Sequence, residues 1–291
     1  MDDPTSALQV IRRAYPDLPI HSVEPHNNEG QFNNLLVVND ELVFRFPRYP
    51  DGVASILNET RILSRIQGCT SLPIPNPIYC SQGTERVGEV FMGYPCLPGE
   101  TLWQPVLAQI EDVHIFERWG EQLAGFLEEL HAVPERIMGS DLPLQDGLAE
   151  WVNLYADIRK HLFEWMRPKA RDEVCFHFED YLKNPALHSY QPALRHGDFG
   201  FGNILYDPQS MNISGVIDFG FVGLGDPAID LASASVLGEK IFKKICQAYP
   251  NADTMLERAR FYRGTYALQE ALHGLLKGDQ EAFESGIEQY R

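Results

Sequence analysis

Apolar residues in the first third of the chain change their spacing several times, and each change predicts a different element. Residues 5–14 and 52–66 carry apolar side chains three or four positions apart, which predicts two amphipathic helices. Four short runs of apolar and β-branched residues predict strands, at residues 35–38, 42–46, 76–80 and 88–94. Asn39-Asp40-Glu41 separates the first two of these strands and predicts a tight hairpin turn.

Beyond residue 101 the apolar spacing is mostly that of helices. Helical periodicity covers residues 115–132, 148–166, 170–183, 227–248 and 253–290. Two short strand-like runs interrupt it, at residues 204–206 and 213–217. The segment Pro-Cys-Leu-Pro-Gly-Glu at 95–100 has the composition of a linker. We therefore predict an α+β fold of two lobes: a sheet-rich N-lobe over residues 1–94, a hinge over 95–100, and a larger, mainly helical C-lobe over 101–291.

Three polar residues in the C-lobe have the spacing of a kinase catalytic loop and its metal-binding loop. Asn203 follows Asp198 by five residues, and Asp218 lies fifteen residues further on, in Asp-Phe-Gly. Phosphoryl transfer needs a carboxylate beside the attacking hydroxyl and oxygen ligands for the magnesium that bridges the nucleotide phosphates. Each residue alone is explained equally well as a turn residue or a helix cap. Their combination, in the order strand, loop, strand, loop, predicts a phosphotransferase.

Three nearby residues are expected to support these loops. His196 is expected to anchor the first loop through hydrogen bonds, because Asp198 already supplies the carboxylate that the reaction needs. Asp226 is expected to cap the next helix, with Pro227 in its first turn. Asp230 is expected to brace the first loop from below. The alternative for Asp226 and Asp230 is a role as metal or substrate ligands.

Arg45 lies in the predicted strand 42–46, between Phe44 and Phe46. Successive side chains of a strand point to opposite faces, so Arg45 faces the cleft between the lobes if the two phenylalanines face the core. Kinases use a strand cation to hold the nucleotide phosphates and a glutamate on the next helix to brace it, which suggests Arg45 and Glu59. The alternatives are a solvent-facing arginine and a surface ion pair of Glu59 with another helix charge.

Two features depart from the usual kinase pattern. Arg45 stands where protein kinases have lysine, and its larger, planar guanidinium is expected to shift the phosphates or weaken catalysis. The segment 27–32 contains one glycine, Gly30, where the kinase phosphate loop has three. Its backbone N–H groups can still cover phosphates, and an ordinary hairpin turn explains it equally well.

Charge and cysteine usage limit the class of partner. The formal net charge of −17 argues against nucleic acid, whose phosphates would be repelled, and is compatible with a cationic ligand. Many cytosolic proteins are similarly acidic. The five cysteines include no Cys-x-x-Cys pair, so neither a zinc site nor a disulfide framework is indicated. No apolar run approaches the ~20 residues that span a bilayer, and Met-Asp-Asp-Pro at the start lacks an apolar signal region. We expect a cytoplasmic protein without a membrane partner.

At these motifs the chain resembles the aminoglycoside phosphotransferase family of small-molecule kinases, which has a protein-kinase-like fold. The matching segments are His196-Gly197-Asp198 with Asn203, Ile217-Asp218-Phe219-Gly220, and Gly225-Asp226-Pro227-Ala228-Ile229-Asp230. The 2″-phosphotransferase branch is similar in particular at Val43-Phe44-Arg45-Phe46-Pro47-Arg48, Asn58-Glu59 and Leu72-Pro73-Ile74-Pro75. The resemblance covers nearly the whole chain in order, and it is more specific for fold and reaction than for substrate.

The resemblance implies a role for each matching residue of the two loops and the strand. Asp198 is implied to be the catalytic base, or the carboxylate that orients the acceptor hydroxyl. Asn203 and Asp218 are implied to hold Mg²⁺. Arg45, braced by Glu59, is implied to stand at the position of the family's phosphate-binding lysine.

The resemblance also implies how the nucleotide base is bound. The base is expected to bond the carbonyl of Pro95 and the N–H of Leu97, and Gly30 is expected to lie in the loop over the phosphates. Tyr94 stands at the gatekeeper position, where a bulky tyrosine is associated in this branch with guanine. The co-substrate is therefore expected to be GTP or ATP, with GTP accepted at least as well as ATP.

The expected acceptor is an aminoglycoside antibiotic or a similar aminocyclitol, a cation that carboxylates of the C-terminal helices would bind. The candidate acceptor-binding residues are Asp198, Glu239, Tyr266 and Glu270. The helix after Asp230 carries only Glu239, a sparser acidic cluster than such a ligand suggests. These acids are equally well explained as solvated helix faces, and Tyr266 as a core aromatic.

Two alternative functions are compatible with the same motifs. The first is a kinase of the same fold that acts on a metabolite or another antibiotic, such as choline, homoserine, methylthioribose or a macrolide. The second is a non-catalytic nucleotide-binding protein, which Arg45 and the glycine-poor loop would favour. The sequence predicts no oligomeric state.

Overall fold

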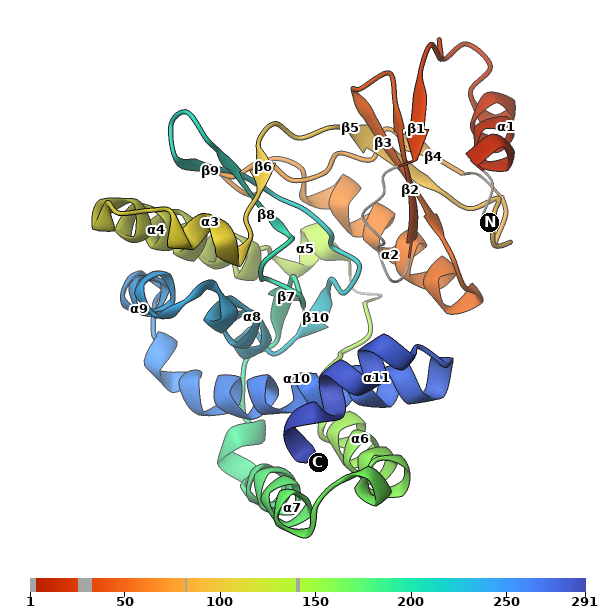
Figure 1. The fold of residues 1–291 in the computed structure, drawn as a ribbon. Helices are drawn as coiled ribbons and strands as arrows, with labels where there is room; N and C mark the ends of the chain where they lie inside the picture. The colour runs from red at the N-terminus through yellow and green to blue at the C-terminus, as the bar shows by residue number, and fades with distance from the viewer. Residues whose placement is uncertain (1–3, 26–32, 82, 140–141) are drawn as a thin grey trace.

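An antiparallel sheet of five strands forms the N-terminal part of the molecule (Figure 1), in a computed structural model that describes residues 4–25, 33–81, 83–139 and 142–291. Its strand order is β1-β2-β3-β5-β4, with bounds Val23–Pro25 (β1), Asn33–Val38 (β2), Leu42–Pro47 (β3), Tyr79–Cys80 (β4) and Met92–Pro95 (β5). Asn39 and Asp40, between β2 and β3, both have a φ of +57°. Asn and Asp tolerate this left-handed conformation, so the predicted hairpin turn is confirmed.

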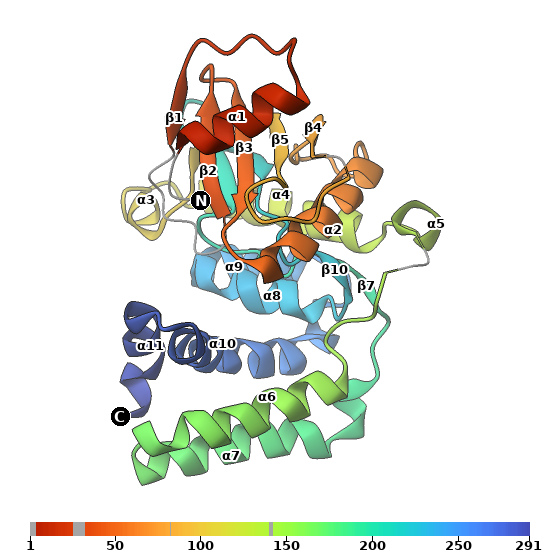
Figure 2. The same ribbon diagram turned by 90° about the vertical axis from the view of Figure 1, so that its right-hand side faces the viewer.

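Two helices, α1 (Pro4–Ala14) and α2 (Pro50–Ile66), cover opposite faces of this sheet (Figures 1 and 2). Phe44 and Phe46 are fully buried in a small core beneath α1. Because side chains alternate along β3, Arg45 points to the other face, where it meets α2. The predicted alternation is therefore confirmed.

The rest of the chain is mainly helical, and two small sheets hold its loops. Its helices are α3 (Gln104–Ala108), α4 (Val113–His131), α5 (Glu135–Met138), α6 (Leu148–His161), α7 (Pro168–Lys183), α8 (Ala228–Ala234), α9 (Glu239–Ala248), α10 (Leu256–Lys277) and α11 (Gln280–Ile287). Its strands are β6 (Glu100–Thr101), β7 (Ala193–Arg195), β8 (Ile204–Asp207), β9 (Asn212–Val216) and β10 (Gly223–Gly225). They form the sheets β6-β8-β9 and β7-β10.

The helices of this part are stacked in layers (Figure 2). Helices α8 and α9 lie above α10 and α11, and α6 and α7 lie below them. One large hydrophobic core joins these helices with α2 and β5, so the sheet and the helical part are packed together. None of the helices in the described ranges is both long and apolar enough to cross a membrane. The fold class predicted from the sequence is confirmed.

Several predicted elements are shorter than expected, for local reasons. The stretch 227–248 is broken at Gly238, which has a φ of +91°, and 253–290 is broken at Gly278, which has a φ of +77° and ends α10. The stretch 148–166 leaves the α-helix after His161 and continues as a 3₁₀ turn. The predicted strand 76–80 is reduced to β4, because Pro77 has no N–H to contribute to a ladder.

Candidate active site

The catalytic loop, residues 196–203, connects β7 to β8. Asn203 Nδ2 donates to the main-chain O and to Oδ2 of Asp198, each at 2.9 Å. Gly197 and Gly202 have φ angles of +89° and +87°, which favour glycine and fold the loop back on itself. The structure therefore brings together two of the three motif residues, Asp198 and Asn203, at one point.

Asp198 is exposed to solvent, as its predicted place beside an acceptor hydroxyl requires. Loss of solvent on its protein side raises the pKa of Asp198, and His196 opposes this shift. A raised pKa makes the carboxylate a better proton acceptor. The indole of Trp103, half exposed, lies against the same loop: a Cβ on Gly202 would come within 3.0 Å of its ring.

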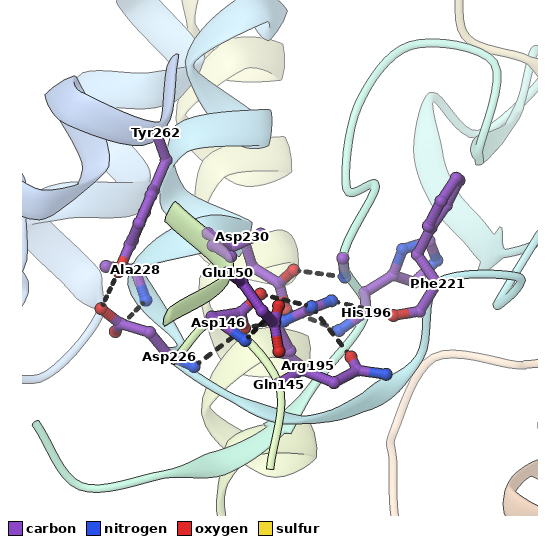
Figure 3. A network of polar contacts seen from close by, with 12 residues as sticks. Gln145, Asp146, Glu150, Arg195, His196, Phe221, Asp226, Ala228, Asp230 and Tyr262 are labelled. Atoms are coloured by element: carbon purple, nitrogen blue, oxygen red, sulfur yellow. Dashed lines mark hydrogen bonds and ion pairs between the residues drawn. The ribbon is translucent and has the colours of Figure 1, made fainter. Parts of the chain in front are cut away.

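A fully buried carboxylate, Asp230 of α8, supports the catalytic loop from the core (Figure 3). It accepts hydrogen bonds from the main-chain N–H groups of His196 (2.8 Å) and Gly197 (2.7 Å), and it pairs with His131 at 3.0 Å. Burial alone would raise the pKa of Asp230, but these partners lower it. His196 is itself buried, and its Nε2 lies 3.0 Å from the carbonyl O of Ile217. The expected anchoring by His196 and bracing by Asp230 are both observed.

The Asp218 loop, residues 217–222, connects β9 to β10 beside the catalytic loop. Ile217 N–H donates to the carbonyl O of Asn203 at 2.8 Å, which ties the two loops together. Asp218 has a φ of +59°, a conformation that Asp tolerates, and its Oδ1 accepts from Gly220 N–H at 3.3 Å. Phe219 is fully buried and anchors the loop in the core. Asp218 therefore lies close to Asn203 with its carboxylate half exposed.

Arg45 connects the two lobes through a pair of carboxylates. Its Nη1 lies 2.6 Å from Glu59 Oε1, and its Nη2 lies 2.7 Å from Asp218 Oδ1. Glu59 Oε1 also accepts from the main-chain N–H of Phe219 at 3.1 Å. Partial loss of solvent would raise the pKa of Asp218, but the Arg45 guanidinium prevails and lowers it. Arg45 thus contacts the Asp218 carboxylate directly, which the sequence-based reasoning did not anticipate.

The predicted hinge follows β5. Cys96 N–H donates to Glu41 O at 2.7 Å, so the carbonyl of Pro95, one residue earlier, points to the opposite edge of the strand. Tyr94 is buried, and burial raises the pKa of its phenol, which also interacts with Arg45. Leu97 is half-buried and approaches Gly215 of β9. Gly30 lies outside the described residues.

The four candidate acceptor residues are not gathered at one point. Tyr266 Oη bonds Ser233 Oγ at 2.9 Å, and burial raises the pKa of Tyr266, with the charges of Asp230 and Asp198 adding to the shift. It is therefore a half-buried residue close to Asp198. Glu239 and Glu270 are exposed at α9 and α10, and within the described ranges neither bonds the catalytic loop.

Two buried ion pairs near the site were not predicted from the sequence. Arg195 pairs with Asp146 at 2.6 Å, and Arg258 of α10 pairs with Asp226 at 2.6 Å. Asp226 also accepts from the N–H of Ala228, the first residue of α8, at 2.9 Å, but the N-cap of α8 is Pro227, one residue later than predicted. One feature of the sequence could have identified Arg195 as a functional residue: it is a charged residue at the end of an otherwise apolar strand, immediately before His196-Gly197-Asp198.

The residues present fit a magnesium ion. Asn203 Oδ1 and Asp218 Oδ2 are hard oxygen ligands, and neither is used in the bonds described above. Two protein ligands suffice, because Mg²⁺ in such sites takes its other ligands from phosphates and water. In the part of the chain that the structure describes, no group of three His, Cys, Asp or Glu side chains forms a separate metal cage.

A two-lobed fold with this pair of loops and a buried strand cation is that of a protein-kinase-like phosphotransferase. Residues 22–263 match the Phosphotransferase enzyme family, and the chain belongs to this family. The predictions of an enzyme, of a transferase with an alcohol acceptor and of a nucleotide co-substrate are confirmed.

Relatives match along the whole chain. Viomycin phosphotransferase from Streptomyces vinaceus is 29% identical over 290 residues, which cover 97% of each protein. A structure of aminoglycoside 2″-phosphotransferase IIIa with GDP and kanamycin is 27% identical, with a TM-score of 0.88 over 97% of this chain and 96% of that one. The GDP complex of wild-type aminoglycoside 2′-phosphotransferase IIIa is also 27% identical, with a TM-score of 0.89 over 99% and 97%. The resemblance to the 2″ branch is confirmed.

Proposed function

We propose that the protein transfers the γ-phosphate of GTP or ATP to a hydroxyl group of a cationic antibiotic, with an aminoglycoside or similar aminocyclitol as the first candidate. The observation that carries this proposal is the convergence of Asp198, Asn203 and Asp218 beside the Arg45–Glu59 pair. Groups that are far apart in the sequence meet there at hydrogen-bond distance.

Asp198 is proposed to act as the catalytic base or orienting carboxylate. The acceptor oxygen attacks the γ-phosphorus, its bond to phosphorus forms as the bond to the β-phosphate oxygen breaks, and the nucleoside diphosphate leaves. The hydroxyl proton passes to the Asp198 carboxylate. Asn203 holds Asp198 through the bond from its Nδ2, so the carboxylate is oriented before the acceptor arrives.

Asn203 and Asp218 are proposed to hold Mg²⁺ through the oxygens that are not engaged elsewhere. The ion, when bound, neutralises charge on the phosphate oxygens. Arg45 is proposed to contact the phosphates in addition to its two carboxylates, because a guanidinium has five N–H donors and only some of these are used in the described contacts. The role of the Gly30 loop remains a prediction.

We propose that residues 95–100 are the hinge between lobes 1–94 and 101–291, and that the nucleotide base bonds Pro95 O and Leu97 N–H. The outward direction of the Pro95 carbonyl supports this assignment. GTP is proposed to serve at least as well as ATP, because Tyr94 fills the gatekeeper position. Two structures at 27% identity that were determined with GDP support this choice. Turnover with ATP and none with GTP would contradict it.

A second candidate acceptor is a cationic peptide antibiotic of the viomycin type. The relative that acts on viomycin matches 97% of this chain. Acidic residues are sparse on α9 and α10, and this argues against an acceptor that carries many ammonium groups. Under either candidate, Tyr266 and Glu270 on α10 and Glu239 on α9 are proposed to contact the acceptor. Cytoplasmic location and the absence of a nucleic-acid partner remain predictions.

The test is a coupled assay of nucleoside diphosphate release, run with GTP and with ATP. The acceptor panel is kanamycin, gentamicin, viomycin, a macrolide, choline, homoserine and methylthioribose, and Asp198→Ala is the blank. Turnover on kanamycin or gentamicin supports the first candidate, and turnover on viomycin alone supports the second. Turnover confined to choline, homoserine or methylthioribose would replace the antibiotic with a metabolite, and no turnover on any acceptor would refute the proposal.

A further inference from the structure

Arg195 lies at the junction of three segments that are distant in the sequence (Figure 3). Its Nε and Nη2 bond the two carboxylate oxygens of Asp146 at 2.6 and 2.8 Å, and Nη2 also bonds Gln145 Oε1 at 2.9 Å. Its Nη1 bonds the carbonyl O of Phe221 at 2.8 Å. One guanidinium therefore joins the segment before α6, the start of the catalytic loop and the end of the Asp218 loop.

The backbone around this guanidinium leaves room for it at three glycines. A Cβ on Gly197 would lie 2.3 Å from Arg195 Nη1, and one on Gly225 would lie 2.0 Å from Asp146 Oδ2. A Cβ on Gly223 would lie 2.4 Å from Gln145 Oε1. No side chain larger than glycine fits at these positions without displacing the network. The close approach of the three segments therefore requires glycine at each of these positions.

Asp146 is held as firmly as the arginine. Both side chains are less than a tenth exposed, and Asp146 has a φ of +63°. Its main-chain O accepts from Trp151 Nε1 at 3.0 Å, and its Oδ2 accepts from Asp226 N–H at 3.2 Å. The carboxylate is therefore fixed relative to α6 and to the start of α8, and it can hold the guanidinium in one orientation.

The bond from Arg195 to Phe221 fixes the end of the Asp218 loop, where Gly197 of the catalytic loop packs closely against Phe221. The start of that loop is tied to the catalytic loop through Ile217, which bonds Asn203 and His196. From the N-lobe, Ser55 Oγ of α2 bonds the carbonyl O of Gly220 at 2.7 Å. Arg195 supplies the matching contact from the C-lobe through the carbonyl O of Phe221. Phe221 lies three residues after Asp218, and Arg195 lies three residues before Asp198.

We propose that Arg195, oriented by Asp146, is a positioning residue that sets the distance between the base Asp198 and the metal ligand Asp218. It contacts neither substrate nor metal and acts through the backbone of both loops. The proposal rests on the proposed kinase function, since it assigns a consequence to those two side chains. A loss of the clamp is expected to weaken Mg²⁺ binding with nucleotide and to slow transfer, because small displacements of reacting groups cost rate steeply.

The test compares Arg195→Lys, Asp146→Asn and the double variant with a matched control, Arg258→Lys. Lysine keeps the charge of Arg195 but makes a single point contact, and asparagine tolerates the left-handed backbone of Asp146. Arg258 belongs to an equally short buried ion pair with Asp226 and bonds neither loop. All assays are run at a temperature at which circular dichroism shows every variant folded.

Each clamp variant is expected to lower kcat at least tenfold and to raise the half-saturating Mg²⁺ concentration at least threefold. The double variant is expected to be no worse than the worse single variant, because the two residues act as one unit. Arg258→Lys is expected to lower the melting temperature while kcat and the Mg²⁺ requirement stay within twofold. Values within twofold of wild type for Arg195→Lys would overturn the proposal, as would equal losses for Arg258→Lys.

A second readout separates this proposal from the kinase function. The affinity for fluorescent GDP or ADP is measured with and without Mg²⁺, which needs no acceptor. Wild type could transfer phosphate to none of the acceptors and still bind nucleotide more tightly in the presence of Mg²⁺. The proposed function would then fail, and the clamp would still be tested by whether Arg195→Lys loses this gain in affinity. An unchanged gain in Arg195→Lys would overturn the clamp even in an active kinase. A wild type that binds no nucleotide would refute both.

Discussion

The catalytic loop and the surface carboxylates Glu239 of α9 and Glu270 of α10 lie in the same part of the molecule but differ in construction. In the loop, Asp198, Asn203 and His196 each have hydrogen-bond partners at defined distances, and a fully buried Asp230 supports the backbone. Glu239 and Glu270 are exposed on helix surfaces. Under the proposed function, this difference means that preorganised loops fix the reaction, whereas the acceptor is selected by side chains that can change without disturbing the fold.

The largest effect in this comparison is expected for Asp198→Asn. The variant removes the proton acceptor while keeping the shape of the side chain, so kcat is expected to fall by about 10³, within the usual range for a general base. Nucleotide affinity is expected to stay within about threefold, because other groups are proposed to hold the phosphates. Steady-state kinetics and nucleotide titration check both. A kcat within tenfold of wild type would show that the loop does not fix the reaction.

Arg45→Ala is expected to have the next largest effect, on stability. It leaves Glu59 buried without its cation, which typically costs about 3–5 kcal/mol. Arg45→Lys keeps the charge and restores the residue usual in kinases, so it is expected to recover most of the loss. Denaturant unfolding of both variants measures the difference. Equal stability of Arg45→Ala and wild type would mean that the two ion pairs of Arg45 contribute nothing to the free energy of unfolding.

Asp230→Asn is expected to lower the free energy of unfolding by about 2 kcal/mol at neutral pH, because two N–H groups of the catalytic loop lose a charged acceptor. The partners of Asp230 lower its pKa in the folded protein. Its stabilisation is therefore present above the ordinary pKa of aspartate and is lost as the pH falls through the folded value. The gap between wild type and variant should close toward acid pH. A gap that widens there would reverse the assigned direction of the shift.

The smallest effects are expected for Glu239→Gln and Glu270→Gln. An exposed carboxylate contributes about 0.2–1 kcal/mol to an ion pair, so each change is expected to raise the KM of a cationic acceptor by about two- to fivefold with kcat unchanged. Initial rates across acceptor concentrations, at low and high salt, measure this effect and its screening. If either variant lowered kcat as much as Asp198→Asn does, the contrast between loops and helix surfaces would be wrong.

Local sequence was sufficient for most of the elements and for the loop motif. The alternation around Arg45 predicted its face correctly, since a strand has a fixed period of two and the flanking phenylalanines are apolar. The spacing of Asp198 and Asn203 predicted a single loop, because five residues with Gly197 and Gly202 can fold back on themselves. Helix ends were predicted less well, since an amphipathic pattern continues across Gly238 and Gly278 even where the backbone reverses.

The partners of Arg45 and Arg195 could not be predicted in the same way. Arg45 and Asp218 are 173 residues apart, and Arg195 and Asp146 are 49 apart. Nothing in the local pattern selects these partners from the many acidic residues of a chain with 41 of them. Their pairing depends on the topology of the sheets and on the glycines that let β10 approach Gln145 and Asp146.

The sequence by itself determined the sheet-rich start, the helical remainder, the catalytic motif and the class of reaction, because periodicity and motif spacing are local properties of a chain. Only the tertiary structure decided that Arg45 contacts the Asp218 carboxylate and that Arg195 joins both loops. These contacts bury charged groups, and a buried charge is stable only where folding brings a partner to hydrogen-bond distance. That distance is a property of the packed molecule, which no local pattern contains.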